Sequence, residues 1–301
     1  EVSAGDKVSM ALTNAGEVYV WGSGDTGLLG YEPKYGSDQD EDESYESEEE
    51  ESVDMKAILE DGEARFPLKI RFFKQGVKKI SCGSEHALAI SMDSVVYSWG
   101  VNSFGQLGIG KTSDPIKTPV EVIGLEDHKI IQVAAGEEHS VLLSTEGQIL
   151  TFGGTAKGKL GFGKSYAEVQ LQPRPIIFSG DEKFCFISCG PENTLAISVE
   201  ESSKSGFLYT WGAGFNGILG HGNREDCFHP KRCDFLGFRS IQFVKAKSGQ
   251  YQTIAMDEKG VLWGCGRAEY VGMPDLSRPN HVFTTLSVIN TMTKYQIQDF
   301  D

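Results

Sequence analysis

One short sequence motif occurs five times in this 301-residue chain, and this repetition constrains the fold more than any other feature. Its clearest copy, VYSWGVNSFGQLGIG at 96–110, alternates apolar and polar residues, reaches a Trp-Gly pair and continues as a glycine-rich loop. The other copies occupy 18–30, 149–163, 208–222 and, in degenerate form, 262–272. The equivalent aromatic position holds Trp21, Trp99, Phe152 and Trp211, followed by Gly22, Gly100, Gly153 and Gly212; in the fifth copy it holds Cys265, with Trp263 two residues earlier on the same predicted strand face. Such repetition predicts one structural unit used several times.

A second motif precedes each copy at a fixed distance. It begins with a glycine, continues after a few residues as alternating small and apolar residues, and ends in a turn; its copies span 2–16, 80–94, 133–147, 187–201 and 246–260. Alternation with a period of two is typical of β-strands with one buried face. After the aromatic residue the backbone must reverse, and glycine tolerates the positive φ angles that a reversal needs. We expect the aromatic side chains to pack between neighbouring sheets.

A proline-containing segment of the form P-x-x-V follows the glycine loop and is predicted to lead into the next unit. It occurs at Pro119–Val122, Pro173–Ile176, Pro230–Cys233 and Pro279–Val282. After the first interval, the aromatic positions lie 53 to 59 residues apart. Several short strands over that length are typical of one four-stranded blade of a β-propeller, whereas the coils of an open β-solenoid, the alternative, are usually shorter. We therefore predict an all-β fold in which residues 1–301 form a single propeller domain of five visible units.

The first interval is longer because it contains an acidic insertion, predicted to span residues 32–64. Within it, residues 37–54 hold eleven Asp and Glu and no Lys or Arg, while the whole chain has a formal net charge of −15. Such a block cannot bury itself and is predicted to be a disordered, solvated loop. The alternative is a binding tail for histones or another basic segment, and Ser47, which precedes four glutamates, is a candidate phosphorylation site. Direct DNA binding by the rest of the chain is disfavoured because it has no basic excess.

The repeated motifs resemble a known family. The Gly-x-x-His strands at Gly83–His86 and Gly136–His139, each followed by an aromatic-Gly and glycine-loop segment, are similar to the regulator of chromosome condensation repeat. This resemblance implies a propeller, most often seven-bladed, so the five units here form either part of a larger ring or a ring with fewer blades. Residues 278–292 resemble a lead-in segment with no repeat behind it. We expect them to supply a terminal strand that completes the first blade and closes the ring, which would remove exposed sheet edges.

The loops that follow the first glycine of each unit are predicted to open on one face of the propeller. This face is the candidate interaction surface, and we assign to it a partner-binding set of Asp6, Glu85, His86, Glu137, Glu138, His139 and Glu192. The same loops carry Lys7, Ser84, Gln250 and Tyr251. For His86 and His139 a structural role is the alternative, because a periodic polar residue at the start of a strand usually bonds the backbone of an adjoining blade.

The chain shows none of the motifs of conventional enzymes. A nucleophile elbow, a phosphate-binding loop and a His-Glu-x-x-His stretch are missing, and no cofactor or metal is predicted. The six cysteines are dispersed and are expected to be free thiols in a reducing compartment. Because no secretory leader or apolar run of membrane-spanning length is present, we expect an intracellular protein, with nucleus and cytoplasm both open.

Two functions follow from the family resemblance. The first is a guanine-nucleotide exchange factor for a Ran-type small GTPase, which would bind the nucleotide-free GTPase through the face defined above and so accelerate nucleotide release. The second is a non-catalytic protein–protein interaction domain, a scaffold or adaptor within a larger protein. The sequence alone leaves both open.

Overall fold

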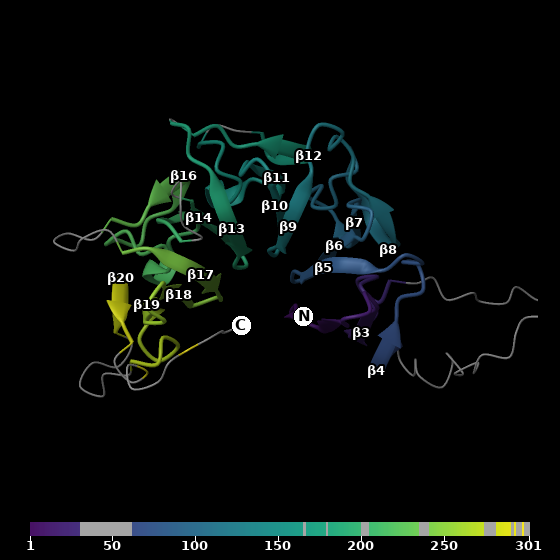
Figure 1. Ribbon diagram of the computed structural model, residues 1–301, viewed down its shortest axis with the longest axis horizontal. Helices are drawn as coiled ribbons and strands as arrows, with labels where there is room; N and C mark the ends of the chain where they lie inside the picture. Colours follow the sequence, from purple (N-terminus) through teal and green to yellow (C-terminus); the bar gives the residue numbers. More distant parts are fainter. Residues whose placement is uncertain are drawn as a thin grey trace, which may run out of the picture.

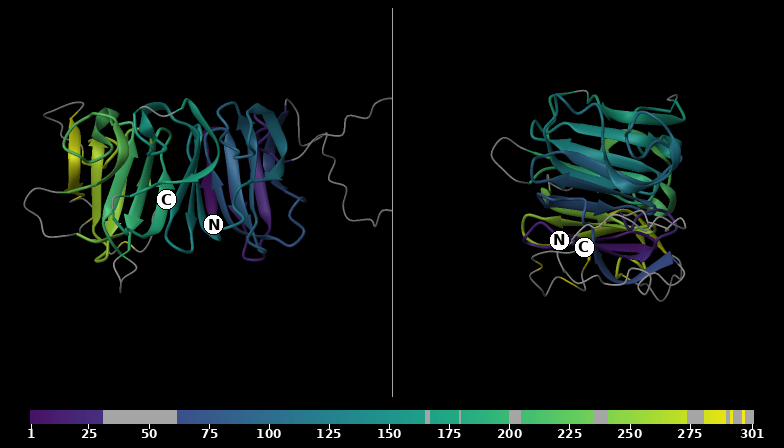
Figure 2. Two further views of the ribbon diagram at one scale, coloured as in Figure 1. Left: turned by 90° about the horizontal axis from the view of Figure 1, so that it is seen from above. Right: turned by 90° about the vertical axis from the view of Figure 1, so that its right-hand side faces the viewer.

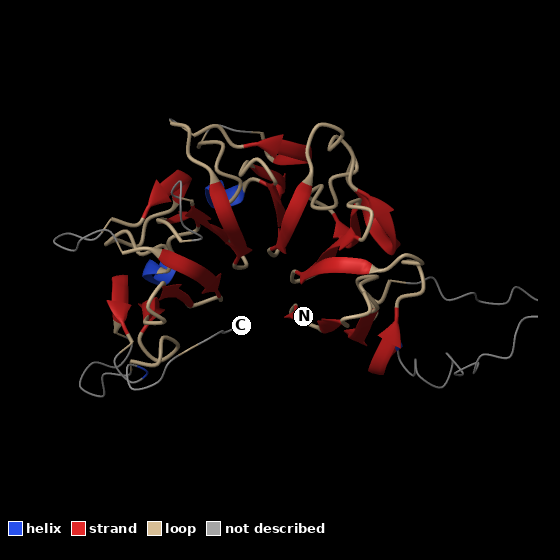
Figure 3. Ribbon diagram, viewed as in Figure 1, coloured by secondary structure: helices blue, strands red, loops and turns tan. Residues whose placement is uncertain are grey.

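Five four-stranded antiparallel sheets stand as blades around a common hub in the computed structural model (Figure 1). The structure describes residues 1–30, 62–164, 167–178, 180–199, 205–234, 241–273 and 281–289, together with Met292 and Ile297. Apart from two short 3-10 helices, η2 (Ala156–Gly158) and η3 (Phe215–Gly217), the regular structure of this described part is all β (Figure 3). The predicted propeller fold of repeated units is confirmed.

Each blade is one continuous stretch of chain. Blade 1 contains β1 (Val2–Ala4), β2 (Val8–Leu12), β3 (Val18–Ser23) and β4 (Glu63–Lys69). Blade 2 contains β5 (Val77–Cys82), β6 (His86–Ser91), β7 (Val96–Asn102) and β8 (Ser113–Glu121). Blade 3 contains β9 (Ile130–Ala135), β10 (His139–Ser144), β11 (Ile149–Gly154) and β12 (Val169–Pro175). Blade 4 contains β13 (Phe184–Cys189), β14 (Asn193–Ser198), β15 (Leu208–Gly212) and β16 (Cys227–Arg232). Blade 5 contains β17 (Phe243–Ser248), β18 (Gln252–Asp257), β19 (Leu262–Arg267) and β20 (Val282–Val288).

The strands of every blade pair in chain order, with the first strand at the hub and the fourth at the rim (Figure 1). The segments at Pro119–Val122, Pro173–Ile176 and Pro230–Cys233 therefore overlap the fourth strand of their own unit, and the prediction that they lead into the next unit was wrong. Of Pro279–Val282, only His281 and Val282 are among the described residues, and β20 begins at Val282. The expected closing strand was also wrong, because β20 pairs with β19 through Trp263 and Val288. Blade 1 has its own fourth strand, β4. This strand contains Pro67, which begins a further proline-containing segment that directly follows the acidic insertion and was not predicted.

The predicted insertion at 32–64 is described only at its end. Strand β4 begins at Glu63 and pairs with β3 through Ser23, so Glu63 and Ala64 belong to the blade. Residues 31–61, including the tract at 37–54 and Ser47, lie outside the described residues.

The aromatic residues of the repeat lie in the seams between blades. Trp99 is fully buried, and its Nε1 donates to the carbonyl of Leu28 in blade 1 at 2.9 Å. Trp211 is fully buried in the same way, and its Nε1 donates to the carbonyl of Lys159 in blade 3 at 3.0 Å. Phe152 is buried between blades 2 and 3. Trp21 is only partly buried because, within the described residues, blade 1 has no preceding blade against its outer face.

The glycine after each aromatic position is required by both space and conformation. The φ angles of Gly22, Gly100, Gly153, Gly212 and Gly266 lie between 104° and 120°. A Cβ atom at Gly100 would lie against the carbonyl oxygen of Glu85, which directly precedes β6, and the same clash recurs in the other four blades. Residues with a Cβ atom rarely adopt these positive φ angles, so glycine is needed at this position of every blade.

Loops gather on two opposite faces of the arc of blades (Figure 2). In blade 3, β10 runs from His139, beside the loop at 136–138, to Ser144, beside the turn at 145–148. The equivalent loops at 5–7, 83–85, 136–138, 190–192 and 249–251 define what we call the glycine-loop face. The opposite end, which carries the turns between the second and third strands, is the hairpin face.

Candidate protein-binding face

The glycine-loop face is held together by direct contacts between loops of successive blades. Gly5, Gly83, Gly136 and Gly190 follow one another around the hub, and a Cβ atom on each of the first three would meet the carbonyl oxygen of the next. The backbone N–H of Ser84 donates to the carbonyl of Gly136 at 3.1 Å, and that of Glu137 donates to Pro191 at 2.9 Å. These contacts bring the predicted residues of blades 1 to 4 into one rigid surface.

Three of the predicted contacts, Asp6, Glu85 and Glu137, are exposed on this face. The pKa of Glu137 is raised, first by partial burial and then by the negative charges of Glu138 and Glu192, with a smaller contribution from Asp6, while the charge of Lys159 opposes the shift. Carboxylates from three blades therefore share one electrostatic environment at Glu137. Such a site favours a positively charged partner group, because that group would relieve the mutual repulsion.

The other two acidic residues of the set are paired within the molecule. Glu138 Oε2 lies 2.6 Å from Nζ of Lys159, whose side chain is only 1% exposed, and Glu192 Oε2 lies 3.2 Å from Nζ of Lys157. The ammonium of Lys157 also lies 5.5 Å from the centre of the Phe215 ring. The face is therefore less acidic than its first loops alone predicted. Neither lysine was predicted to lie here, because both lie in the glycine-rich segment after β11 and not in one of the loops that define the face. In this segment Lys159 takes the position that Gln106 has in blade 2.

His86 and His139 do not belong to the binding surface. Both imidazoles are fully buried, which corrects their assignment to the partner-binding set. His86 Nε2 lies 2.8 Å from the Ser140 hydroxyl in the next blade, and that hydroxyl donates to the carbonyl of Gln106 at 2.7 Å. Since the hydroxyl has one hydrogen, which it gives to the carbonyl, the Nε2 atom of His86 must be the donor. His86 therefore has the structural role that the sequence analysis gave as the alternative. It bonds a side-chain hydroxyl of the adjoining blade, where a backbone group was expected.

The same arrangement links blade 3 to blade 4. His139 Nε2 lies 3.0 Å from the Thr194 hydroxyl, which donates to the carbonyl of Lys159 at 2.9 Å. Burial lowers the pKa of His86 to about 3. Burial, together with the charge of Lys159, lowers the pKa of His139 well below its usual value. Both side chains therefore act as neutral braces between blades.

An aromatic patch borders the acidic part of the face at blades 4 and 5. The Tyr251 and Tyr270 rings lie 4.8 Å apart, and Tyr270 is 48% exposed. The guanidinium of Arg267 lies 4.6 Å from the centre of the Tyr251 ring, and its Nε donates to Asn216 Oδ1 at 3.2 Å. Only Tyr251 was placed here from the sequence; the degenerate fifth repeat concealed Arg267 and Tyr270. Exposed, stacked aromatic rings of this kind are enriched at protein interfaces.

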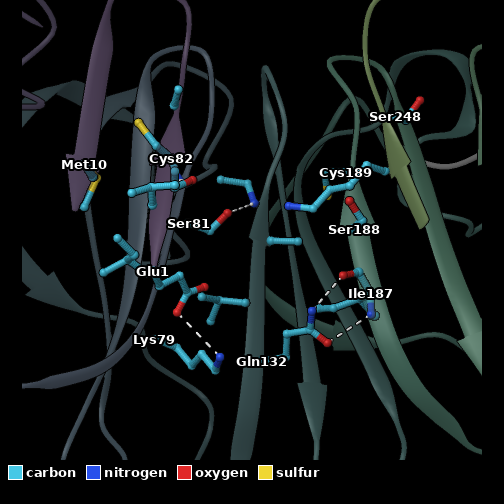
Figure 4. A pocket seen from close by; sticks show the side chains of 18 of the residues that line it. Glu1, Met10, Lys79, Ser81, Cys82, Gln132, Ile187, Ser188, Cys189 and Ser248 are labelled. Carbon is cyan, nitrogen blue, oxygen red and sulfur yellow. Dashed lines mark hydrogen bonds and ion pairs between the residues drawn. The ribbon is translucent and has the colours of Figure 1, made fainter. Parts of the chain in front are cut away.

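An open cavity of about 1040 Å³ lies at the hub and is lined mainly by the first strands of the blades (Figure 4). The side chain of Gln132 donates to the carbonyl of Ile187 at 2.8 Å and accepts from the Ile187 N–H at 3.1 Å. Lys79 Nζ lies 3.5 Å from a carboxylate oxygen of Glu1, and the Ser81 hydroxyl accepts the N–H of Ala135 at 3.0 Å. These polar groups bind one another across neighbouring strands, so they brace the hub.

The remaining chemistry of the described residues is limited. No three His, Cys, Asp or Glu side chains among them come together as a potential metal site. No helix in the described ranges has the length and apolarity to cross a membrane. The six cysteines are free, and burial raises the pKa of the Cys82 and Cys233 thiols to about 12. Such thiols are poor nucleophiles at neutral pH.

Comparison with known proteins gives one family and several relatives. A family model for the RCC1-like domain matches residues 1–247. The chain is 33% identical over 267 residues to the ultraviolet-B receptor UVR8 of Arabidopsis thaliana, covering 88% of this chain and 52% of the receptor. It is 34% identical over 202 residues to the human probable E3 ubiquitin-protein ligase HERC3, covering 66% of this chain and 18% of the ligase. The chain thus spans about half of the first relative and less than a fifth of the second.

A solved structure supports the fold independently. Prp20p of Saccharomyces cerevisiae, described with its binding properties to Gsp1p and histones, superposes with a TM-score of 0.71 at 20% identity. The match covers 96% of this chain and 65% of Prp20p. At this identity the likeness shows the blade architecture alone.

Proposed function

The chain belongs to the RCC1-like domain family, and from this premise we propose that it is a protein-binding propeller whose glycine-loop face holds a basic protein surface. The observation that carries the proposal is the convergence of acidic loops from different blades on Glu137, whose pKa is raised by partial burial and then by Glu138 and Glu192. A lysine or arginine of a partner would stabilise these carboxylates. The adjoining Tyr251 and Tyr270 would supply apolar contact area.

The rigidity of the face supports a binding role. Its loops are fixed by the backbone hydrogen bonds from Ser84 to Gly136 and from Glu137 to Pro191. A preorganised surface loses less conformational entropy when it binds, so more of the contact energy becomes affinity. Because the exposed acids come from separate blades, they also fix the orientation of a partner whose positive charges match their spacing.

A two-hybrid screen would test this proposal, since it selects partners by binding alone. Specific partners of the wild-type chain are counter-screened against the double variant Glu85→Lys, Glu137→Lys and against a control, Lys111→Glu, which also changes charge on an exposed residue but lies at the rim in the β7–β8 loop. We expect the double variant to lose most partners and the control to keep them. Partners that bind the double variant as well as the wild type would contradict the proposal.

Nucleotide exchange on a Ran-type small GTPase is the second candidate. The specific observation in its favour is the similarity to Prp20p, whose structure was described with its binding to Gsp1p. The mechanism needs no covalent chemistry: a surface that binds the nucleotide-free GTPase more tightly than the loaded form accelerates nucleotide release. Histones, also named for Prp20p, are proposed here as partners of the acidic tract at 37–54 because of its charge.

A release assay separates exchange from binding alone. Small GTPases loaded with fluorescent GDP are mixed with the purified chain, and loss of fluorescence is followed with and without excess GTP. Accelerated release for one GTPase, abolished by Glu85→Lys, Glu137→Lys, would support exchange through this face. Partners without any acceleration across the panel would leave the chain as a binding domain only.

A further inference from the structure

A groove opens on the hairpin face where blades 3 and 4 meet, at the opposite end of the blades from the glycine-loop face. It has a volume of about 1480 Å³. Its walls are the β10–β11 turn at 146–148, the segments at 175–178 and 180–183 between β12 and β13, and side chains of β15 and β16. Because it lies at the far end of the strands, a segment bound there would not cover the glycine-loop face.

The floor of the groove is a cluster of aromatic rings, in which Phe178 and Tyr209 line the groove and the buried Phe184 packs against both. The Phe178 ring lies 4.6 Å from the Phe184 ring, and the Phe184 ring lies 5.4 Å from the Tyr209 ring, nearly perpendicular to it. Phe178 and Tyr209 pack on the core between blades 3 and 4, so their positions are fixed. Ile177 extends from this floor and is 90% exposed. Covering these side chains would remove apolar surface from water, which favours association.

On the blade 4 side, the groove is walled by Arg232, which lies over the ring of Phe207. The guanidinium of Arg232 lies 3.2 Å from the centre of the Phe207 ring, and its Nε lies 2.9 Å from Asp234 Oδ1. Asp234, on the same blade, partly offsets the Arg232 charge. The guanidinium over the Phe207 ring gives the groove one flat wall.

The rim of the groove is acidic. Among the described residues that line it, the carboxylates of Glu146, Asp181 and Glu182 face the cations of Lys183 and Arg232, and Arg232 is ion-paired with Asp234. Glu182 and Tyr209 line the same groove. Burial first, and then the charge of Glu182, raise the pKa of Tyr209, and the charge of Arg232 opposes this shift. Carboxylates beside an exposed apolar floor fit a segment that combines basic and apolar side chains.

The equivalent seams differ in this respect. At the seam of blades 1 and 2 the position of Ile177 is taken by Arg71, and the aromatic rings of Phe72, Phe73 and Tyr97 pack on one another at 5.2 to 5.6 Å. At the seam of blades 2 and 3 the equivalent residue is Ile123, which is 40% exposed and stands against Gly110. Of these three seams, that of blades 3 and 4 therefore has the most exposed aliphatic side chain at this position, Ile177 at 90%.

We propose that this groove docks an extended peptide segment of a protein partner, in which one aliphatic or aromatic side chain is flanked by lysine or arginine. The apolar side chain contacts Ile177 and Phe178, and the basic side chains pair with Asp181, Glu182 and Glu146. This site would let the propeller hold a second partner while the glycine-loop face is occupied. It does not depend on the function proposed for that face.

A phage-displayed library of random peptides tests the groove with a defined probe. The library is panned against the purified chain, with counter-selection on the variant Ile177→Asp. We expect enriched peptides in which Lys or Arg flanks Leu, Ile, Val or Phe. No enrichment, or enrichment of acidic or uncharged peptides only, would overturn the proposal.

Binding of one enriched synthetic peptide, followed by fluorescence anisotropy, then locates the site. We expect Ile177→Asp and the double variant Asp181→Lys, Glu182→Lys each to weaken binding by about tenfold or more. Ile123→Asp, at the equivalent position of the neighbouring seam, and Glu137→Lys, on the opposite face, should change it by less than about twofold. Unaltered binding to Ile177→Asp would also overturn the proposal. All the substituted side chains are exposed, so each variant should keep the thermal midpoint of the wild type.

Discussion

His86 and Ser140 belong to different blades, and their side chains join at 2.8 Å in the buried seam between them. The Ser140 hydroxyl donates a hydrogen bond to the carbonyl of Gln106. It therefore bonds two groups of blade 2, the His86 ring and the Gln106 carbonyl, from blade 3. In the next seam His139 and Thr194 repeat this bridge at 3.0 Å. In the following seam Asn193 and Ser248 replace the pair, with the amide donating at 3.0 Å. The bridge therefore requires a donor at the start of one strand and a hydroxyl on the next blade, not a histidine as such.

Acid should loosen the blades through these histidines. The pKa of His86 is lowered to about 3 and that of His139 well below 6.5, both chiefly by burial. Between about pH 6.5 and 4 the unfolded chain binds a proton at His86 while the folded chain does not, and His139 acts in the same direction. Stability is therefore complete above about pH 6.5 and falls as the pH falls. The loss should be about 1.4 kcal/mol per pH unit for each histidine. Urea unfolding at about pH 7 and pH 5 measures it.

His86→Asn is the matched variant for this test, because Asn occupies the position in blade 4. It should retain a donor to Ser140 while removing one titrating group, so the stability of the variant should depend less on pH than that of the wild type. An equal pH dependence of the unfolding free energy in both proteins would show that proton binding at His86 does not differ between the folded and unfolded chains.

Truncation of Trp99 and of Trp21 to alanine should lower the unfolding free energy by different amounts. Trp99 is fully buried and donates to Leu28, whereas Trp21 is partly exposed on the outer face of blade 1. Trp99→Ala should therefore destabilise the chain by about 3–5 kcal/mol, as is usual for a large buried aromatic residue. Trp21→Ala should cost clearly less. Equal losses in urea unfolding would mean that the face of Trp21 is covered in solution.

Much of this architecture is encoded locally, and the sequence motifs predicted it. The glycine after each aromatic residue and the alternation of small and apolar residues locate the second and third strand of every blade. The fourth strand was misassigned because a segment such as Pro119–Val122 has the same strand pattern whether it ends one blade or begins the next. Only the hydrogen bonding of β8 to β7 decides between them.

The candidate site was predictable only in part, for a physical reason. The loops were placed on the right face because they follow strands of fixed direction. The partners of Glu138 and Glu192 were not predicted, since Lys159 and Lys157 are 21 and 35 residues away in sequence and reach them through the fold. Burial of His86 and His139 likewise depends on a neighbouring blade, which a single repeat does not reveal.

Removal of the acidic tract should leave the fold intact. Residues 37–54 interrupt blade 1 between β3 and β4, and eleven of them are acidic. A segment of this composition buries little apolar surface, so its deletion should leave the thermal midpoint unchanged at moderate salt. Differential scanning fluorimetry of the deletion variant beside the full chain measures this. A large fall in the midpoint would contradict the solvated-loop prediction and indicate that the tract packs on the propeller.

The pair formed by Lys159 and Glu138 should be asymmetric in its effect on stability. The Lys159 side chain is 1% exposed, while that of Glu138 is 30% exposed, and the two atoms lie 2.6 Å apart. Glu138→Gln would leave a buried ammonium without its counter-charge and should destabilise the chain by about 1–3 kcal/mol. Lys159→Met keeps the packing volume and leaves only a partly hydrated carboxylate, so its loss should be smaller. The double variant should regain part of the loss of Glu138→Gln, because it no longer holds a buried charge. Unfolding free energies of the four proteins give the coupling energy directly. Equal losses in the two single variants, adding in the double, would show that the two charges do not interact.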